Sequence, residues 1–505
     1  MTLETLLGLV MLVVMIGAIF IGIQISFTLL FLALLFGYFG LGVTVFDLAY
    51  FQTIGMMKEE LLAAVPLFIF MGYITEQAGL MERLFGAFRM VLAPVRGSLY
   101  IVVILTSAVF AMATGIVGAA VTVLGIMAGP IMIKTGYDAK LSAGTITAGG
   151  TLGILIPPSV MLIVMGPVLG VSVADLYSAA FGPGFMLASI YLVYLVGRSM
   201  INPKLGPPVP KEERVTDIVA ILKEVVIGVF PLAALIAATL GSILAGLATP
   251  TEASGIGALG ALILAIAYRR LTYAALKQAV ISATLTSAMV LLLAVTSNIF
   301  GAVFARLGTA TWITNFMTSL PVPPLAMLGM VIFLLFLLGW PFEWPAIILV
   351  FLPIFYPVVD ALKPALSQSF GIPPEYFLVW FGALVAVTMQ TAYLSPPVAM
   401  SAYYLKQVVR EWSLGTIYKG MFEFMILQCI AIAAVMFVPQ IATWLPQTLN
   451  AQQQAIQTEE VDDSQNRLEE DPAKAMQEEQ EEEEEKKGEE KKGDALEKDD
   501  MKPKQ

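Results

Sequence analysis

The chain has 505 residues, of which 58% are apolar and 13% are charged, and its mean hydropathy is +0.83. Soluble domains are nearer half apolar, so the composition predicts a polytopic α-helical membrane protein rather than a soluble domain. The sequence has no histidine and one cysteine, Cys429. It therefore lacks the commonest proton shuttle and metal ligand, which argues against an intramembrane enzyme, and it cannot form an intrachain disulfide.

The net charge of −10 comes from the C-terminal tail. Residues 451–505 hold 20 acidic and 9 basic side chains, whereas the rest of the chain holds 18 acidic and 19 basic side chains. A highly charged segment with almost no aromatic residues cannot bury a core. We predict that residues 450–505 form a disordered acidic tail, either a solvated extension or a binding tail, and that the membrane body is nearly neutral.

The first half of the chain predicts one transmembrane repeat at residues 1–197. It opens with spans at residues 3–23 and 24–41, and no basic segment marks the first as a cleaved signal peptide. Residues 76–96 mix charged and apolar side chains, as in an amphipathic interfacial helix or a short soluble loop. A re-entrant hairpin at about residues 99–134 and a broken helix at about residues 141–170 complete the repeat.

A basic, proline-rich segment at residues 198–224 predicts a cytoplasmic linker between two halves. The second repeat, residues 225–449, then contains a hairpin at about residues 325–359 and a broken helix at about residues 377–404. The basic pair Arg269-Arg270 marks another cytoplasmic loop. We expect ten full spans besides the two hairpins, with both termini on the outer side.

The first broken helix contains Gly149-Gly150-Thr151-Leu152-Gly153-Ile154-Leu155-Ile156-Pro157-Pro158-Ser159. Proline has no backbone N–H, so Pro157 and Pro158 leave the carbonyls of Gly153 and Ile154 without helical donors. Bare carbonyls at membrane depth survive only inside protein or beside a wet cavity. Broken helices of this kind hold cations and substrates in secondary transporters.

The second half repeats this pattern in Gln390-Thr391-Ala392-Tyr393-Leu394-Ser395-Pro396-Pro397-Val398. Here the prolines free the carbonyls of Ala392 and Tyr393. Pro130 and Pro353, each about one helix beyond a hairpin tip, also correspond. The predicted fold is therefore all-α, with two inverted repeats that each contain a re-entrant hairpin and a broken helix.

We expect the hairpin tips to face the broken helices and to hold a cation between them. The alternative is that the proline pairs are kinks satisfied by neighbouring helices. The candidate ligands for the cation are Gly149, Gly150, Gly153, Ile154, Thr391, Ala392, Tyr393 and Glu343, and those for the substrate are Thr114, Gly115, Gly118, Ser159, Pro341 and Ser395.

Three further charged residues allow two interpretations each. Glu343 lies in the second hairpin tip, where an ionisable group at membrane depth is either functional or caps a helix end. Glu252 follows Thr251 at the start of a span, where capping is the stronger interpretation. Arg306 is either an interfacial anchor or a contact for an anionic substrate.

Three motifs together resemble the large membrane subunit of TRAP (tripartite ATP-independent periplasmic) transporters: Gly153-Ile154-Leu155-Ile156-Pro157-Pro158-Ser159, Ala248-Thr249-Pro250-Thr251-Glu252-Ala253 and Ser395-Pro396-Pro397-Val398. The resemblance covers residues 1–445. It implies an elevator-type secondary transporter of the ion transporter superfamily in a bacterial inner membrane. It also implies Na⁺-driven uptake of organic acids, a small four-helix membrane subunit and a periplasmic substrate-binding protein.

The two hairpin tips depart from the pattern of this family. The first tip, Thr114-Gly115-Ile116-Val117-Gly118, has fewer hydroxyl groups, and the second carries Trp340 and Trp344. A self-sufficient symporter or antiporter of the same superfamily and a membrane scaffold without transport are the alternative functions. The chain contains no Gly-x-x-x-x-Gly-Lys-[Ser/Thr] phosphate loop, which agrees with transport that is not driven by ATP.

Overall fold

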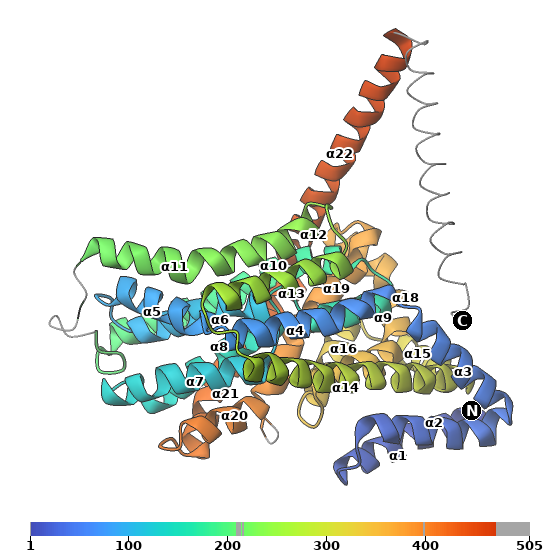
Figure 1. Ribbon diagram of the computed structural model, residues 1–505. Coiled ribbons are helices and arrows are strands. Elements are labelled where there is room, and N and C mark those ends of the chain that lie inside the picture. Colours follow the sequence, from blue (N-terminus) through green and yellow to red (C-terminus); the bar gives the residue numbers. More distant parts are fainter. Residues whose placement is uncertain (1, 209–213, 215–216, 397–398, 471–505) are drawn as a thin grey trace, which may run out of the picture. The chain divides into compact units, whose positions relative to one another are not determined.

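The computed structural model describes residues 2–208, 214, 217–396 and 399–470, and within these ranges it contains helices and no strand (Figure 1). The predicted all-α membrane architecture is thereby confirmed. Residues up to Pro446 form one compact unit, called the membrane unit below, and residues from Gln447 onward form a second unit.

The first half of the membrane unit runs from α1 to α10. Its elements are α1 (Leu3–Phe20), α2 (Ile25–Leu41), α3 (Thr44–Met57), η1 (Glu60–Ala63), α4 (Ala64–Gln77), α5 (Leu80–Leu92), α6 (Ser98–Thr114), α7 (Val117–Lys134), α8 (Ala139–Thr151), η2 (Leu152–Ile154), α9 (Val160–Leu169) and α10 (Val173–Ile201). The arms of the first expected hairpin are α6 and α7, joined by Gly115 and Ile116. The first broken helix consists of α8, η2 and α9.

The second half, from α11 to α21, has the same order of elements, and α22 follows it. They are α11 (Ile218–Ile236), η4 (Ala237–Gly241), α12 (Ser242–Leu244), α13 (Pro250–Ala267), α14 (Tyr273–Arg306), α15 (Thr309–Thr318), α16 (Pro324–Leu338), α17 (Trp344–Ala346), η5 (Ile347–Phe351), α18 (Leu352–Phe370), α19 (Pro374–Met389), η6 (Gln390–Tyr393), α20 (Met400–Val408), α21 (Leu414–Phe437) and α22 (Gln440–Glu470). The second hairpin consists of α16 and the α17–η5–α18 arm, and the second broken helix of α19, η6 and α20.

Several element boundaries differ from the sequence expectations. Helix α10 continues to Ile201 and α11 begins at Ile218, so the connection between the halves is shorter than the predicted linker. Helix α22 continues to Glu470, and residues 451–470 are helical although we predicted disorder there. The rest of the predicted tail lies outside the described residues. Residues 80–92 form a helix with a buried apolar side, not a loop.

Nine helices of the described chain are long and apolar enough to cross a membrane, or ten if the α4 and α5 region, bent by 59°, is one span. We predicted ten spans in addition to the hairpins. Two of the nine, Val117–Lys134 and Trp344–Phe370, are hairpin arms. The three predicted spans that are absent from the other seven are Ile25–Leu41, which is a shorter apolar helix, the bent α4 and α5 region, and the first broken helix, which consists of the short helices α8 and α9.

The two halves interlock in a reciprocal way. In four cases a helix of one half packs against a helix of the other and the corresponding helices also pack against each other. The reciprocal contacts are α4 on α13 with α14 on α2, α8 on α21 with α19 on α10, α7 on α20 with η5 on α9, and α5 on α11 with α15 on α1. This exchange pattern is what two inverted repeats around a shared axis produce.

A polar cluster joins α8, α10 and α21 within the membrane unit. Lys140 Nζ lies 2.5 Å from Glu423 Oε1. Tyr194 donates a hydrogen bond to Glu423 Oε2 at 2.7 Å and accepts one from Arg198 at 2.9 Å. Glu423 therefore connects side chains from two other helices.

At the start of α13, the second span of the second half, Thr249 and Glu252 form a capping box. The main-chain N–H of Thr249 donates to Glu252 Oε2 at 2.7 Å, and the N–H of Glu252 donates to Thr249 Oγ1 at 3.2 Å. The capping interpretation of Glu252 is correct. Arg306 is an exposed residue in the last turn of α14.

Helices α8 and α21 approach so closely that their backbones touch. A Cβ atom added to Gly420 would lie 2.1 Å from the carbonyl oxygen of Lys140 and 2.8 Å from the main-chain nitrogen of Gly144. Both atoms belong to the backbone of α8, so they cannot move aside as a flexible side chain would.

We expect Gly420→Ala to lower the stability of the protein by about 1–3 kcal/mol or more, because the added methyl group forces the two helices apart. The control is Gly415→Ala in the same helix, where the nearest atom is Ser413 Oγ at 3.8 Å. Thermal unfolding of the purified variants in detergent measures both effects. Equal Tm values for the two variants would contradict the close packing.

Candidate functional site

The first break begins where α8 ends at Thr151. The N–H groups of Leu155 and Ile156 both donate to the carbonyl of Leu152, at 3.1 and 2.9 Å. Pro157 then supplies no N–H to the carbonyl of Gly153. The segment is buried in protein, as a broken helix at membrane depth must be.

The second break has the same backbone geometry. The N–H groups of Leu394 and Ser395 both donate to the carbonyl of Thr391, at 3.0 and 2.9 Å. When Pro157 is aligned with Pro396, Leu152 falls on Thr391, so the duplicated sequence motif is also a duplicated structure. Residues 397 and 398 of this motif lie outside the described residues.

Each hairpin tip touches the break of its own half at the corresponding position. Gly115 has a φ of +61°, and a Cβ atom there would lie 3.6 Å from the Pro158 carbonyl oxygen and 3.7 Å from that of Gly153. A Cβ atom on Gly339 would lie 3.2 Å from Cα of Ala392. Ala392 is the residue that aligns with Gly153, so the two tips meet equivalent points.

The candidate hydroxyl groups at the breaks donate to main-chain carbonyls. Ser159 Oγ donates to the carbonyl of Ile154 at 2.6 Å, so this carbonyl has a partner. Ser395 Oγ donates to the carbonyl of Thr391 at 2.6 Å, and Thr391 Oγ1 donates to that of Thr388 at 2.7 Å. These hydroxyl groups hold the shape of the breaks, and their oxygen lone pairs remain as possible acceptors.

Two of the candidate glycines serve helix packing. A Cβ atom added to Gly149 would lie 2.6 Å from Ser107 Oγ, and one added to Gly150 would lie 2.3 Å from Val121 Cγ2. Both glycines therefore let α8 approach the hairpin arms α6 and α7. Gly118 faces the ring of Tyr404, which a Cβ atom would approach to 3.0 Å.

The remaining candidate residues lie in the two hairpin tips. Pro341 lies in the turn between α16 and α17. Glu343 occupies the N-cap position of α17, but its side chain makes no capping hydrogen bond. The helix-capping interpretation of Glu343 is therefore wrong. The side chain of Thr114, at the first tip, lies outside the described part of the chain.

A cavity of about 510 Å³ lies between the hairpin tips, the breaks, α4 and α14. It brings together the predicted residues Gly115, Gly118, Ile154, Glu343 and Tyr393. Its other polar side chains are Tyr73, Glu76, Thr122, Thr286, Tyr404 and Gln407. Of these, Tyr73, Glu76 and Thr286 come from α4 and α14, which the sequence reasoning did not connect with the tips. The lining contains two carboxylates and no lysine or arginine.

The additional lining residues had one usable signal in the sequence. Tyr73, Glu76 and Thr286 are polar residues within apolar helices, which marks them as functional candidates. Only the packing of α4 and α14 against distant hairpins shows that they share a cavity. Tyr73 and Thr286 are linked directly by a hydrogen bond of 3.2 Å between their hydroxyl oxygens.

Gln390 is a further residue that the sequence reasoning named only as part of a motif. It is fully buried at the start of the second break. Among the described residues, neither its amide nitrogen nor its amide oxygen has a hydrogen-bond partner. Buried amides are nearly always paired, so this one is available to an ion, a water molecule or a ligand.

We expect Gln390→Met to leave the Tm unchanged or to raise it, since an unpaired buried amide costs about 1–3 kcal/mol. Thr388→Val is the control two residues away, because the Thr388 hydroxyl donates to the carbonyl of Leu384 at 2.8 Å and its loss should lower the Tm. Thermal unfolding without added substrate compares the variants. A lower Tm for Gln390→Met, equal to that of Thr388→Val, would show that the amide is paired.

Comparison with known proteins places this geometry in one family. The family profile described as "Tripartite ATP-independent periplasmic transporter, DctM component" matches residues 10–441. The match covers nearly all of the membrane unit.

Two curated relatives cover most of the chain. The sialic acid TRAP transporter large permease protein SiaM of Vibrio cholerae is 29% identical over 437 residues, which cover 85% of this chain and 96% of the relative. The C4-dicarboxylate TRAP transporter large permease protein DctM of Pseudomonas aeruginosa is 27% identical over 391 residues, which cover 77% and 86% of the two chains.

A solved structure shares the fold. The YdaH transporter of Alcanivorax borkumensis, described as having an unusual topology, superimposes with a TM-score of 0.53 at 16% identity, over 80% of this chain and 89% of that chain. The family match, the relatives and the long apolar helices agree with the resemblance in the motifs. The chain belongs to the large permease subunits of tripartite ATP-independent periplasmic transporters, and it is a multi-pass protein of the bacterial inner membrane.

Proposed function

We propose that this chain is the permease of a Na⁺-coupled importer that receives an organic acid from a periplasmic binding protein and works beside a small four-helix membrane subunit. The observation that carries this proposal is the approach of Gly115 to the carbonyls of Gly153 and Pro158. Two relatives are named for sialic acid and for C4-dicarboxylates, and both of these substrates are carboxylates.

The first hairpin tip and the first break fit a monovalent cation. In the described part of the chain, no group of three or more His, Cys, Asp or Glu side chains could hold a metal ion. Neutral carbonyls are weaker ligands than carboxylates, and they bind Na⁺ in the broken helices of other secondary transporters. The carbonyls of Gly153 and Pro158 would therefore be ligands for Na⁺ beside Gly115.

The cavity also offers partial positive charge to a carboxylate. Val117, Gly118 and Ala119, the first residues of α7, line it, as does Val160 at the start of α9. N–H groups at a helix N-terminus have no intrahelical acceptors and carry positive dipole charge. With no basic side chain in the lining, Na⁺ would balance the charges of Glu76, Glu343 and the substrate.

The membrane potential can supply the driving force. Each net positive charge that moves inward gains about 2.3 kcal/mol per 100 mV. That energy supports roughly fifty-fold accumulation, because ~1.4 kcal/mol is tenfold. Cotransport of Na⁺ in excess of the substrate charge would therefore drive uptake without ATP.

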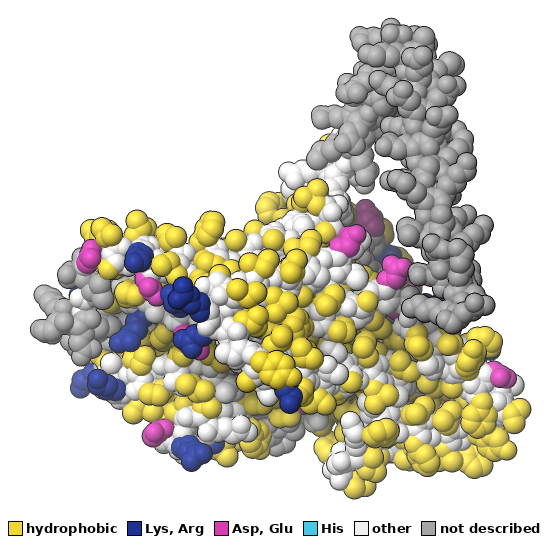
Figure 2. Space-filling view, in the orientation of Figure 1, with side chains coloured by type: hydrophobic (Ala, Val, Ile, Leu, Met, Phe, Trp, Pro, Cys, Tyr) yellow, Lys and Arg dark blue, Asp and Glu magenta, His cyan; other side chains and the backbone are white. Residues whose placement is uncertain are grey.

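The distribution of charge supports an orientation in which this cavity opens toward the cytoplasm. Lysine and arginine gather at the end of the membrane unit where α5 and the end of α7 lie (Figure 2). Short basic loops stay on the cytoplasmic side. The cavity residues Glu76 and Gln407 lie close in sequence to Arg83 and Arg410.

The repeat geometry supports an elevator movement. We call α2, α3, α4, α13 and α14 the scaffold group, and the hairpins with the broken helices the hairpin group. The cavity lies between the two groups. Sliding the hairpin group along the scaffold group would carry the tips, with their ligands, from one side of the membrane to the other.

The test is uptake into proteoliposomes that contain the chain and its membrane partner, with the loaded binding protein outside. We expect uptake that requires an inward Na⁺ gradient and that is lost when choline replaces Na⁺. In Gly115→Ala the new methyl group would lie against the Gly153 and Pro158 carbonyls. The Na⁺ concentration for half-maximal uptake should rise roughly tenfold, which corresponds to ~1.4 kcal/mol of lost ion binding.

Gly136→Ala is the matched control. Gly136 also has a positive φ, +76°, but its Cβ position is open, so the backbone strain is similar and the site is untouched. An unchanged Na⁺ dependence in Gly115→Ala would contradict the ion site. Uptake by the chain alone, without partner or binding protein, would favour a self-sufficient symporter.

A further inference from the structure

A carboxylate and four aromatic rings line part of the cavity of about 510 Å³ described above. The carboxylate is that of Glu343, and the rings are those of Tyr73, Trp344, Tyr393 and Tyr404. The rings come from α4, α17, η6 and α20, and Glu343 directly precedes α17. We call these five residues the aromatic cluster. The Na⁺ site proposed beside the first hairpin tip uses none of them.

The members of the aromatic cluster lie close to one another. The charge of Glu343 acts on the hydroxyl groups of both Tyr393 and Tyr404, and Tyr404 is also within electrostatic reach of Tyr73. The Trp344 side chain lies beside the Tyr393 hydroxyl. Glu343 is therefore a carboxylate with aromatic side chains from several elements around it.

The Glu343 carboxylate lacks a positive partner. Among the described residues it forms no salt bridge, and it makes no capping hydrogen bond. Lys406, the lysine in α20, does not line the cavity, and its ammonium group donates to the carbonyls of Arg410 and Trp412 at 2.7 and 2.8 Å. A charge at membrane depth is costly and is almost always paired. Glu343 therefore needs a cation from outside the chain.

The rings favour an organic cation in this place. The faces of tryptophan and tyrosine rings attract an ammonium group, and clusters of such rings recognise alkylated ammonium ligands. A carboxylate beside the rings adds the opposite charge. The aromatic cluster therefore has the chemistry of a site for a cationic nitrogen.

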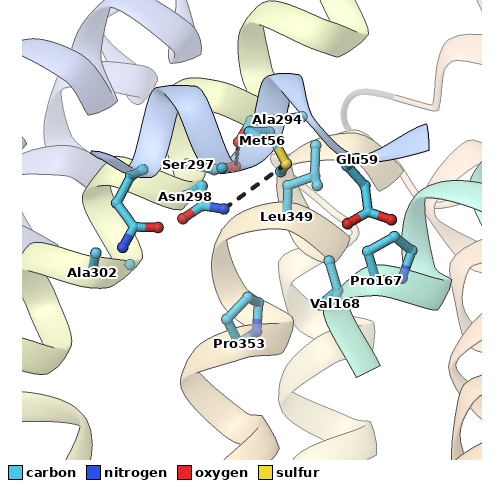
Figure 3. Close-up of a pocket in the computed structure, with 13 residues that line it drawn as sticks. Met56, Glu59, Pro167, Val168, Ala294, Ser297, Asn298, Ala302, Leu349 and Pro353 are labelled. Atoms are coloured by element: carbon cyan, nitrogen blue, oxygen red, sulfur yellow. Dashed lines mark hydrogen bonds between the residues drawn. The ribbon is translucent and has the colours of Figure 1, made fainter. Parts of the chain in front are cut away.

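A second cavity between the scaffold group and the hairpin group lacks this chemistry (Figure 3). Its volume is about 450 Å³, and of the described residues that line it, one is a carboxylate, Glu59, and none is aromatic. The combination of a carboxylate with rings is thus specific to the cavity at the hairpin tips.

The place proposed for the substrate carboxylate adjoins the aromatic cluster. The first turn of α7, at Val117, Gly118 and Ala119, lines the same cavity. A Cβ atom on Gly118 would lie 3.0 Å from Cζ of Tyr404. Tyr404 therefore lies against the start of α7 and is also within reach of Glu343. One small ligand with a negative group and a positive group could occupy both places.

We propose that the aromatic cluster is a subsite for a cationic nitrogen, and that the substrate is a zwitterion whose carboxylate is bound at the start of α7. This inference rests on the proposed import of an organic acid and names its chemical class. The substrates named for the two relatives, sialic acid and C4-dicarboxylates, carry no cationic nitrogen. The positive group of the substrate would share with Na⁺ the balancing of the cavity carboxylates.

The first measurement compares two pairs of ligands with matched shapes. Glycine betaine is paired with tert-butylacetate, in which carbon replaces the ammonium nitrogen, and alanine is paired with isobutyrate, in which a methyl group replaces the ammonium group. Thermal unfolding of the chain with its membrane partner, in Na⁺ and at a series of ligand concentrations, gives each Kd. We expect at least one zwitterion to bind about tenfold more tightly than its matched anion. If neither zwitterion does, the subsite is overturned.

The second measurement assigns this preference to residues. Glu343→Gln should abolish the preference for the zwitterion and leave the Kd of the matched anion unchanged or lower, because a negative charge has been removed. Tyr404→Leu should weaken the preference, and Tyr404→Phe, which keeps the ring, should retain it.

Glu59→Gln is the matched control, since it removes a carboxylate from the cavity without aromatic side chains, and it should keep the full preference. If Glu343→Gln also keeps the preference and only raises the Na⁺ concentration that binding requires, Glu343 is an ion ligand and the subsite is refuted.

The unmodified protein separates this inference from the proposed function. If the zwitterions bind more tightly than the anions but binding is independent of Na⁺, the Na⁺-coupled function fails and the subsite stands. If Na⁺ strengthens the binding of succinate or of the matched anions and the zwitterions bind no better, the Na⁺-coupled function stands and the subsite fails.

Discussion

The structure depends on main-chain carbonyls that lose their helical donors in a region without bulk water. Pro157 and Pro396 impose this loss at corresponding points of the two halves, and the chain resolves it in the same way each time. A short 3₁₀ turn gathers two N–H groups on one carbonyl, that of Leu152 or Thr391, and the next residue in sequence, Gly153 or Ala392, lies against a hairpin tip. At the first break it is the Gly153 carbonyl that faces the tip. An exposed carbonyl of this kind is costly in lipid but useful as a ligand for a cation.

The duplicated breaks explain why the rest of the membrane unit interlocks. Neither broken helix can face lipid, so each half covers the break of the other: α21 packs on α8, and α10 packs on α19. The contact between α21 and α8 is close enough that Gly420 and Gly144 touch through their backbones.

The sequence was sufficient to predict features that follow from local chemistry. The missing N–H groups, the motif spacing and the apolar runs predicted the positions of the breaks and the hairpins. The capping interaction of Glu252 could be predicted because Thr249 and Glu252 lie within one helical turn. Features that depend on distant packing could not be predicted. Tyr73 and Thr286 reach the tips only because α4 and α14 fold against hairpins far away in the sequence, and the Ser159 hydroxyl turns to Ile154 only once the break has formed.

The most direct test of this account is an experimental density map of the transporter in Na⁺ compared with one in choline. We expect an ion peak in Na⁺ at the Gly153 carbonyl, beside Gly115, and no peak there in choline. If no ion peak appears at the break in saturating Na⁺, in a preparation whose uptake is driven by Na⁺, the assignment of these carbonyls as the ion ligands is contradicted.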